Sequence, residues 1–363
     1  MEQIKIGILT FSAAHNFGAI LQCYGLYSTL CSMGHDVKVI DYRPSYLATY
    51  EPKFGWRQVV SRHIGTLRKR WNTYSYWRRI YEGYMTFKER EMIMTPPVLT
   101  PEEFEKVSIQ FDCIVVGSDQ IWNPNFNGND TVWFGGHSSP NIKMIAYGAS
   151  AGNPSNLMKI YDLTNKLNRF SAISVREPEL SIALSKYVDS CFIQNVLDPS
   201  LLADNSVWEK WIEPIEKGDY ILTYQARESN DVFRIAESLA EQLKCSGIIP
   251  VDFYGNVEAL GYKSRITSPS EFISLVKNAR CVVTTSFHGT AFSIILGTPF
   301  YTIRLNDGAD NRSAGLLESL GLLSRMIDYT DTPTFSKVEF DKTNSKLTLL
   351  RASSLEFLTS SLV

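Results

Sequence analysis

CVVTTSFHGTAFSIILGTPFYTIRL, residues 281–305, predicts a strand, a helix and a second strand. Its first six residues are mainly β-branched, which is typical of a buried strand. An apolar run then continues to Gly297, a residue type common at helix C-termini, and Pro299 prevents the helix from continuing. The next strand is predicted over 300–305. Two strands connected through a helix indicate a parallel α/β sheet.

The same alternation runs through the rest of the chain. Further strands are predicted at 4–11, 36–42, 111–118, 143–150, 172–177, 220–225 and 247–253, with helices at 18–34, 231–244 and 268–279. A chain of 363 residues is long for one hydrophobic core, so we predict two domains. The fold class is α/β, with two doubly wound (Rossmann-like) domains that face each other across a cleft. Their expected limits are 1–210 and 218–345, followed by a C-terminal helix over 346–363.

Composition narrows the classes of function. The formal net charge of -2 gives no general attraction to nucleic acid, which we therefore do not expect as a partner. Six cysteines without a CxxC pair indicate neither a zinc site nor a disulfide framework, and reduced thiols favour a cytoplasmic protein. The N-terminus does not resemble a signal peptide, and no apolar run approaches 18 residues, so we expect no membrane span.

One segment, 54–90, departs from the α/β alternation. Its apolar and aromatic residues recur every three or four positions, which predicts one long amphipathic helix or two shorter ones. Ten Lys or Arg stand against two acidic residues between Lys53 and Arg90. Two interpretations remain open. The insertion packs its aromatic face on the first domain, or it is an interfacial helix that contacts anionic lipid or a lipid-linked substrate at the inner face of the membrane.

A histidine occupies the junction between the strand and the helix of 281–305. In open α/β sheets, ligands bind beyond the carboxyl ends of the strands, where helix N-termini present unpaired N–H groups. Ser286, Gly289 and Thr290 there favour an anion, and His288 suits proton transfer near neutral pH. The alternative is a buried histidine that caps its own helix.

Polar residues also follow other predicted strands. They are His15, Asn16 and Gly18 after the first strand, Ser118, Asp119, Gln120 and Trp122 after a strand in mid-domain, and Arg176 and Glu177 after another. Each signal is weak alone, since Arg176 and Glu177 could be a surface pair. Together they occupy one edge of the predicted sheet, which favours a functional cleft.

The motifs NFGAILQ, VVGSDQIWNP, SVRE, LDPSLL and SFHGTAFSIILGTPF, in this order, resemble those of the polysaccharide pyruvyl transferase family. The resemblance extends from about residue 5 to 325. It implies a fold similar to the glycosyltransferase B type and phosphoenolpyruvate as the donor. It also implies that a pyruvate ketal is placed on two hydroxyls of a sugar, free or lipid-linked, in a cell-surface polysaccharide.

The resemblance also implies roles for individual residues. His288 is the leading catalytic residue, and Arg176 is a candidate for binding the donor's anionic groups. Some family members have an arginine at the position of Ser286. Arg304 or Arg312 is expected to take the role of that arginine here; the alternative is that both are surface residues. Gly289 and Thr290 complete the donor side. The acceptor side, or the support of the cleft, is assigned to His15, Asn16, Gly18, Asp119 and Gln120.

The chemistry needs a proton donor and an anion clamp, and arginines can provide the clamp without a metal. We therefore expect no metal and no cofactor, with phosphoenolpyruvate as a co-substrate. A hydrolase using Ser286 and His288 is disfavoured because the chain has no GxSxG motif. Two alternatives remain: a glycosyltransferase that uses a nucleotide sugar, and a non-catalytic glycan-binding protein.

Overall fold

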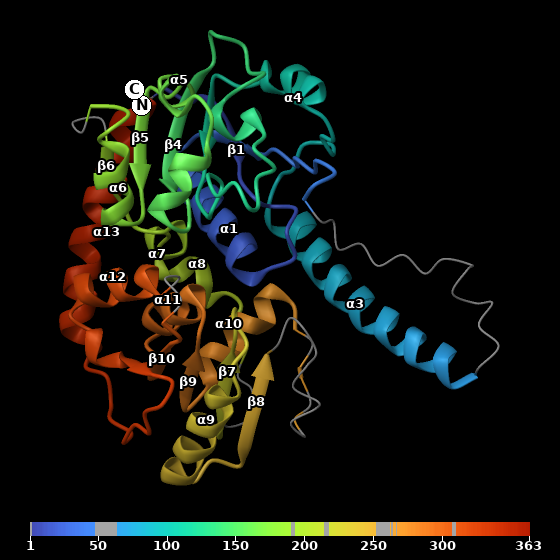
Figure 1. Ribbon diagram of the computed structural model, residues 1–363, viewed down its shortest axis with the longest axis vertical. Helices are drawn as coiled ribbons and strands as arrows, with labels where there is room; N and C mark the ends of the chain where they lie inside the picture. The colour runs from blue at the N-terminus through green and yellow to red at the C-terminus, as the bar shows by residue number, and fades with distance from the viewer. Residues whose placement is uncertain are drawn as a thin grey trace.

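The computed structural model describes residues 2–47, 64–189, 193–213, 218–251, 262, 264–265, 267–306 and 310–363; in the helix that begins at residue 64, side chains are described from residue 74. These residues form two parallel sheets flanked by helices, one above the other in Figure 1. The predicted fold class, two α/β domains with parallel sheets, is confirmed.

The first sheet has the strand order β2-β1-β3-β4-β5-β6, with all neighbours parallel. Its strands are β1 (Lys5–Leu9), β2 (Asp36–Val39), β3 (Cys113–Val116), β4 (Lys143–Ala149), β5 (Ala172–Val175) and β6 (Ile193–Asn195). All four residues of β3 are buried, because the strand lies inside the sheet. Because all these strands are parallel, the carboxyl ends of β1, β3 and β5 lie along the same side of the sheet.

The second sheet has the order β11-β10-β9-β7-β8, again parallel throughout. Its strands are β7 (Tyr220–Tyr224), β8 (Gly247–Val251), β9 (Cys281–Thr284), β10 (Phe300–Arg304) and β11 (Met326–Asp328). The sequence did not predict β6 or β11. Each has three residues at a sheet edge, too short for a periodic pattern.

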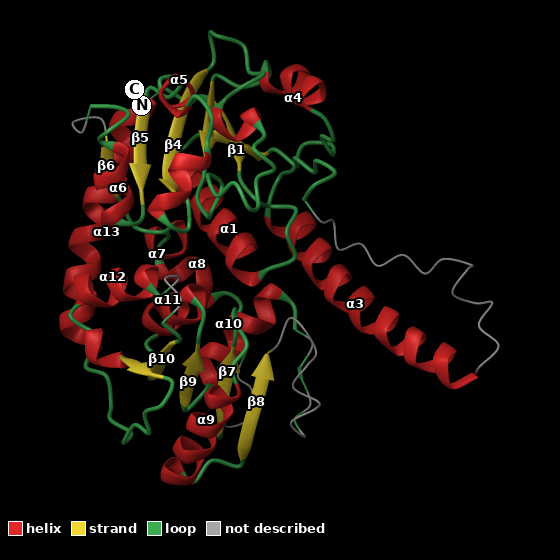
Figure 2. Cartoon of the chain, in the orientation of Figure 1, coloured by secondary structure: helices red, strands yellow, loops and turns green. Residues whose placement is uncertain are grey.

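Helices connect the strands and cover the sheets (Figure 2). Up to residue 209 they are α1 (Phe17–Ser32), α3 (Ile64–Glu91), α4 (Pro101–Ser108), α5 (Leu163–Leu167), α6 (Pro178–Leu184), α7 (Pro199–Leu202) and α8 (Asn205–Glu209). From residue 230 onward they are α9 (Asn230–Leu243), α10 (Pro269–Asn278), α11 (Phe287–Leu296), α12 (Asn311–Leu320) and α13 (Phe340–Leu362). The predicted boundary, between residues 210 and 218, falls between β6 and β7, and residues 214–217 lie outside the described chain.

The two domains share a hydrophobic core. The ring of Phe17 in α1 stacks on that of Phe272 in α10, with centroids 4.6 Å apart. The C-terminal helix α13 begins beside the second domain and ends near the N-terminus (Figure 1), and the Ser354 hydroxyl accepts a 2.9 Å hydrogen bond from Leu197 N. These contacts hold the carboxyl edges of both sheets toward each other.

The basic insertion contains the long helix α3, which projects from the body of the molecule in Figure 1. Its second half packs on the core: Ile80, Tyr84 and Phe87 are buried, and the Tyr84 ring stacks on Phe17. The first ten residues of the predicted 54–90 helix lie outside the described chain. None of the described helices is long and apolar enough to cross a bilayer.

Candidate active site

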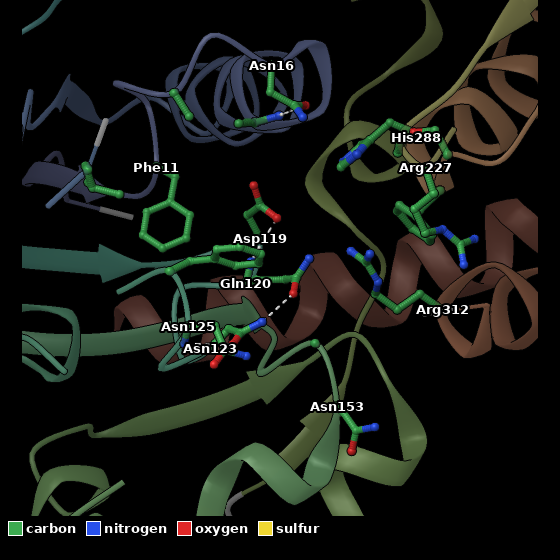
Figure 3. Close-up of a pocket in the computed structure, with 18 of the residues that line it drawn as sticks. Phe11, Asn16, Asp119, Gln120, Asn123, Asn125, Asn153, Arg227, His288 and Arg312 are labelled. Carbon is green, nitrogen blue, oxygen red and sulfur yellow. Dashed lines mark hydrogen bonds between the residues drawn. The ribbon is translucent and has the colours of Figure 1, made fainter. Parts of the chain in front are cut away.

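A cavity of about 630 Å³ lies between the two domains, where the carboxyl edges of both sheets meet. The first domain lines it through the segments that follow β1, β2, β3 and β4. The second domain contributes the segments after β7 and β9 and the first turn of α12. Figure 3 shows Arg227, His288 and Arg312 on one side of this cavity and Asp119, Gln120 and Asn123 on the other.

His288 lies in the first turn of α11, directly after β9. Ser286 is the N-cap of this helix, and its hydroxyl accepts a 3.4 Å hydrogen bond from Gly289 N. Gly289 has to be small, because a Cβ there would lie 2.3 Å from Thr284 Oγ1. The helix start is thereby pressed against the end of β9, and the His288 imidazole reaches the cavity wall.

The imidazole also lies against the opposite domain. A Cβ on Gly18, in the first turn of α1, would be only 2.1 Å from His288 Nδ1. Asn16 caps α1 by accepting hydrogen bonds from Gly18 N (2.7 Å) and Ala19 N (3.3 Å). His288 thus comes from the second domain but is held in a recess of the first.

A buried carboxylate, Asp198, completes this recess. Its Oδ2 lies 3.7 Å from His288 Nε2 and forms an ion pair with Arg176 Nη1, and the Arg176 side chain is 4% exposed. Burial alone would raise the pKa of Asp198, but the charges of Arg176 and His288 outweigh it and lower this pKa well below its usual range. The ion pair with Arg176 therefore favours the charged form of Asp198.

Arg176 lies behind the main cavity and beside a smaller one of about 140 Å³. Phe287 and Arg312 line both cavities, and the Arg176 guanidinium lies 5.4 Å from the centre of the Phe287 ring. Among the described residues, Arg176 Nε and Nη2 have no hydrogen-bond partner although both atoms are buried. Glu177 accepts a 2.8 Å hydrogen bond from Ser150, and burial raises its pKa.

Two further arginines make the second domain's side of the cavity cationic. Arg227 donates to Asp310 (2.7 Å) and to the Thr285 carbonyl (3.2 Å), which fixes its guanidinium at the cavity wall. Arg312 forms no ion pair with a described residue, and its buried Nε has no hydrogen-bond partner among them. Burial and the nearby Arg176 lower the pKa of Arg312, yet an arginine stays charged near neutral pH.

The first domain's side of the cavity is rich in amides and aromatic rings. Gln120 accepts a 2.8 Å hydrogen bond from Asn123, whose own Oδ1 lies 3.4 Å from Asn156 Nδ2. Other members of this wall are Phe11, Tyr46, Asn125, Phe126 and Asn153. Apart from Asp119 and His15, the wall offers uncharged hydrogen-bonding groups, which suits a ligand with many hydroxyls.

The sequence profile of one family, polysaccharide pyruvyl transferase, matches residues 16–307. The chain belongs to the polysaccharide pyruvyl transferase family. No curated protein is significantly similar to it. The family indicates a transferase, and the match spans both domains and so includes most of the cavity wall.

Solved structures with a similar fold include a UDP-N-acetylglucosamine 2-epimerase from Listeria monocytogenes, with 10% identity, 99% of this chain and 88% of that chain covered, and a TM-score of 0.51. S. aureus MnaA, solved with UDP, has 9% identity, 96% and 88% coverage and a TM-score of 0.50. An alpha-glucosyltransferase solved with UDP and DNA has 12% identity, 98% and 95% coverage and a TM-score of 0.47. At this identity the likeness concerns the fold, which is similar to the glycosyltransferase B type.

Most residues that the sequence singled out as candidates meet at the cavity of this pyruvyl transferase family member. His15, Asn16, Asp119, Gln120, Ser286, His288 and Arg312 line it, Gly18 lies under the His288 ring, and Arg176 lines the smaller cavity behind it. The alternative, a buried histidine that caps its own helix, holds in one part only. His288 is buried (7% exposed), but Ser286 provides the cap, and the imidazole lies against Gly18 of the other domain and lines the cavity.

Three predicted donor-side residues lie elsewhere. Arg304 ends β10, opposite Asp328 of the edge strand β11, and lines neither of the two cavities. The Thr290 hydroxyl is 2.7 Å from Thr302 Oγ1 in the interior, since its place on α11 faces the sheet. Gly289 supports the turn and does not line the cavity.

Sequence reasoning missed Arg227, Asp198 and the amides beyond Gln120. Arg227 follows β7, so the rule that identified polar residues after other strands could have found it. Asp198 lies in the motif LDPSLL, but it was assigned no role in the site from the sequence. Its side chain turns out to face both Arg176 and His288, which depends on how α7 packs and which no local pattern predicts.

Proposed function

We propose that this family member transfers the enolpyruvyl group of phosphoenolpyruvate to a sugar of a cell-surface polysaccharide or its lipid-linked precursor. The product is a pyruvate ketal, and inorganic phosphate is released. The observation that carries the proposal is the position of His288, which lines a cavity with a cationic wall on its own domain and an amide-rich wall, with Asp119 as its carboxylate, on the other.

The cationic wall suits the donor. Phosphoenolpyruvate carries a carboxylate and a phosphate, and arginine guanidinium groups bind both kinds of anion through paired hydrogen bonds. The arginine that some relatives have two residues before the histidine is absent here, and Ser286 caps α11 instead. Arg312 and Arg227 stand on the same wall and take over the clamp in this proposal.

His288 is suited to start the reaction as a general acid. It gives a proton to the methylene carbon of the donor, so that positive charge develops on the adjacent carbon. One sugar hydroxyl bonds to that carbon and releases its proton. The carbon–oxygen bond to phosphate then breaks, with its electron pair leaving on phosphate, and the second hydroxyl closes the ketal. Of the two hydroxyl protons, one restores His288 and the other leaves on phosphate.

The amide-rich wall suits the acceptor. Side-chain amides both donate to and accept from sugar hydroxyls, and the exposed ring of Phe126 (52% exposed) can cover the apolar face of a sugar ring. The cavity volume lies within the range of small-molecule sites, which supports a site for a donor and one sugar ring together. The acceptor in this proposal is therefore an uncharged sugar.

The test is incubation of the protein with phosphoenolpyruvate and a panel of neutral glycosides, free and lipid-linked. We expect phosphate release matched by an acceptor mass gain of one pyruvate less one water. His288→Ala should lower turnover by about a hundredfold or more, whereas His137→Ala, an exposed histidine outside the cavity, should leave it unchanged. Turnover of nucleotide sugars without use of phosphoenolpyruvate would favour a glycosyltransferase, and binding of glycans without turnover would favour a glycan-binding protein.

A further inference from the structure

Asp198 has a larger set of partners than a helix cap requires. As N-cap of α7, its Oδ1 accepts hydrogen bonds from Ser200 N (2.9 Å) and Ser200 Oγ (2.6 Å). Its Oδ2 is not needed for the cap. This second oxygen is turned to Arg176 of the same domain and to His288 of the opposite domain.

This oxygen lies close to two side chains that can both carry positive charge, Arg176 and His288. Arg176 is charged, and a protonated His288 beside it would be repelled. The Asp198 carboxylate lies against both, and its side chain is fully buried, so that little solvent screens the attraction. A buried carboxylate is costly unless it is paired, which makes this placement informative about function.

We propose that Asp198 is a positioning residue for the reaction proposed above: its carboxylate orients His288 across the domain interface and stabilises the positive charge of the proton-donating ring. The proposal rests on the proposed function for its kinetic part only. At 3.7 Å, the separation of Nε2 and Oδ2 is longer than a hydrogen bond but within the range of an ion pair.

Other charged or titratable groups surround the pair. They come from the loop after β3, from β4, from the end of β5 and from α12, and they are Asp119, Tyr147, Arg176, Glu177 and Arg312. Asp119 Oδ1 is 4.0 Å from Arg176 Nη2, and burial raises the pKa of Glu177. Asp198 is the carboxylate of this group that forms an ion pair with His288.

The decisive variant is Asp198→Asn, because an asparagine can keep the cap on Ser200 but removes the charge. The chain offers a matched control in Asp204, which caps α8 through the same two bonds to Ser206, at 2.9 and 2.6 Å, and is exposed. Asp198→Asn should lower kcat by about a hundredfold and move the alkaline limb of the kcat/KM profile to lower pH by about one unit. Asp204→Asn should change neither.

A double variant keeps the proposal testable if Asp198→Asn alone does not fold. Removing both charges of a buried pair is tolerated better than removing one, so Arg176→Met combined with Asp198→Asn is expected to fold. Arg176→Met alone should move the alkaline limb to no lower pH, because the carboxylate still faces His288 and a neighbouring positive charge is gone. The double variant should have its alkaline limb about one unit lower in pH than Arg176→Met. An alkaline limb that is the same with and without Asp198 would overturn the proposal.

A readout without turnover separates this proposal from the proposed function. Diethyl pyrocarbonate reacts with neutral imidazole, and mass spectrometry of peptides resolves each histidine. At pH 6, His288 should react up to about tenfold faster in Asp198→Asn than in the wild type, while exposed His137 reacts equally in both. If phosphoenolpyruvate is not turned over but this difference is found, the proposed function fails and the role of Asp198 stands. Equal rates at His288 would refute that role.

Discussion

The contact between Gly18 and His288 leads to the most specific prediction. Replacing Gly18 by alanine adds one methyl group to the first turn of α1. That Cβ would lie 2.1 Å from Nδ1, 2.6 Å from Cε1 and 2.7 Å from Cγ of the His288 ring. Ordinary contacts are about 3.5 Å, so the ring has to move by about 1.4 Å, away from Gly18.

The expected cost falls on catalysis more than on folding. Alanine is favoured over glycine in helices by up to about 1 kcal/mol, which offsets part of the roughly 1–3 kcal/mol that overpacking costs. A displacement of about 1 Å at a catalytic group can cost about a hundredfold in rate, equivalent to about 2.7 kcal/mol of activation free energy. We therefore expect kcat/KM for phosphoenolpyruvate to fall about a hundredfold in a folded protein.

The assay is continuous phosphate release, with the melting temperature and far-UV circular dichroism of each variant as the check on folding. The matched control is Gly247→Ala in β8, because nothing lies within 4 Å of a Cβ at that position. It should keep activity within about twofold. A Gly18→Ala protein that retains wild-type kcat/KM would refute the argument that His288 needs this recess.

Three further predictions address charge and pH. Arg312→Lys should raise KM for phosphoenolpyruvate about tenfold and Arg312→Ala about a hundredfold, with smaller changes in kcat. Lysine has the smaller effect because it keeps the positive charge and loses only the planar guanidinium. Unchanged KM values in steady-state assays would exclude Arg312 from the clamp. Burial, with Lys88 and Arg43 nearby, lowers the pKa of His15 from 6.5 to about 4. The unfolded chain thus binds this proton more readily, and the free energy of unfolding should fall by about 3 kcal/mol as pH drops from 6.5 to 4. Urea titrations at several pH values should show this loss in the wild type but not in His15→Gln. The same pH dependence of the unfolding free energy in both proteins would contradict the prediction. We also propose that α3 contacts anionic membranes. Changing the exposed Arg79 to Glu should then reduce co-flotation of the protein with phosphatidylglycerol vesicles several-fold. Equal flotation of the variant and the wild type would favour a helix that only packs on the body of the protein.

Much of the fold follows from the sequence because its signals are local. The run CVVT needs burial on both faces, and Ser268 with Pro269 and Glu271 marks the start of α10, where the Ser268 hydroxyl accepts from Glu271 N at 3.2 Å. The rule that polar groups after parallel strands share an edge places Asp119 at the edge of the first sheet and His288 at the edge of the second, and the predicted cleft between the two domains sets them opposite each other. Both now line one cavity.

The rest of the site depends on packing between distant segments. Arg304 and Arg312 were equivalent candidates in the sequence, but one ends a strand near the sheet edge and the other begins a helix at the cavity. The contact of Asp198 with His288 joins residues of two domains. Such contacts follow from how α1, α7 and α11 meet, and the periodicity of each helix alone does not contain that information.

The most direct measurement of the central claim is the reaction run in heavy water with phosphoenolpyruvate and a neutral sugar acceptor, with the product followed by mass spectrometry and proton NMR. If His288 delivers a solvent-exchangeable proton to the methylene carbon, the ketal methyl group gains one deuterium for each phosphate released, and His288→Ala slows both events together. A ketal whose methyl group carries no deuterium, or deuterium incorporation that proceeds at the wild-type rate in His288→Ala, would contradict the account.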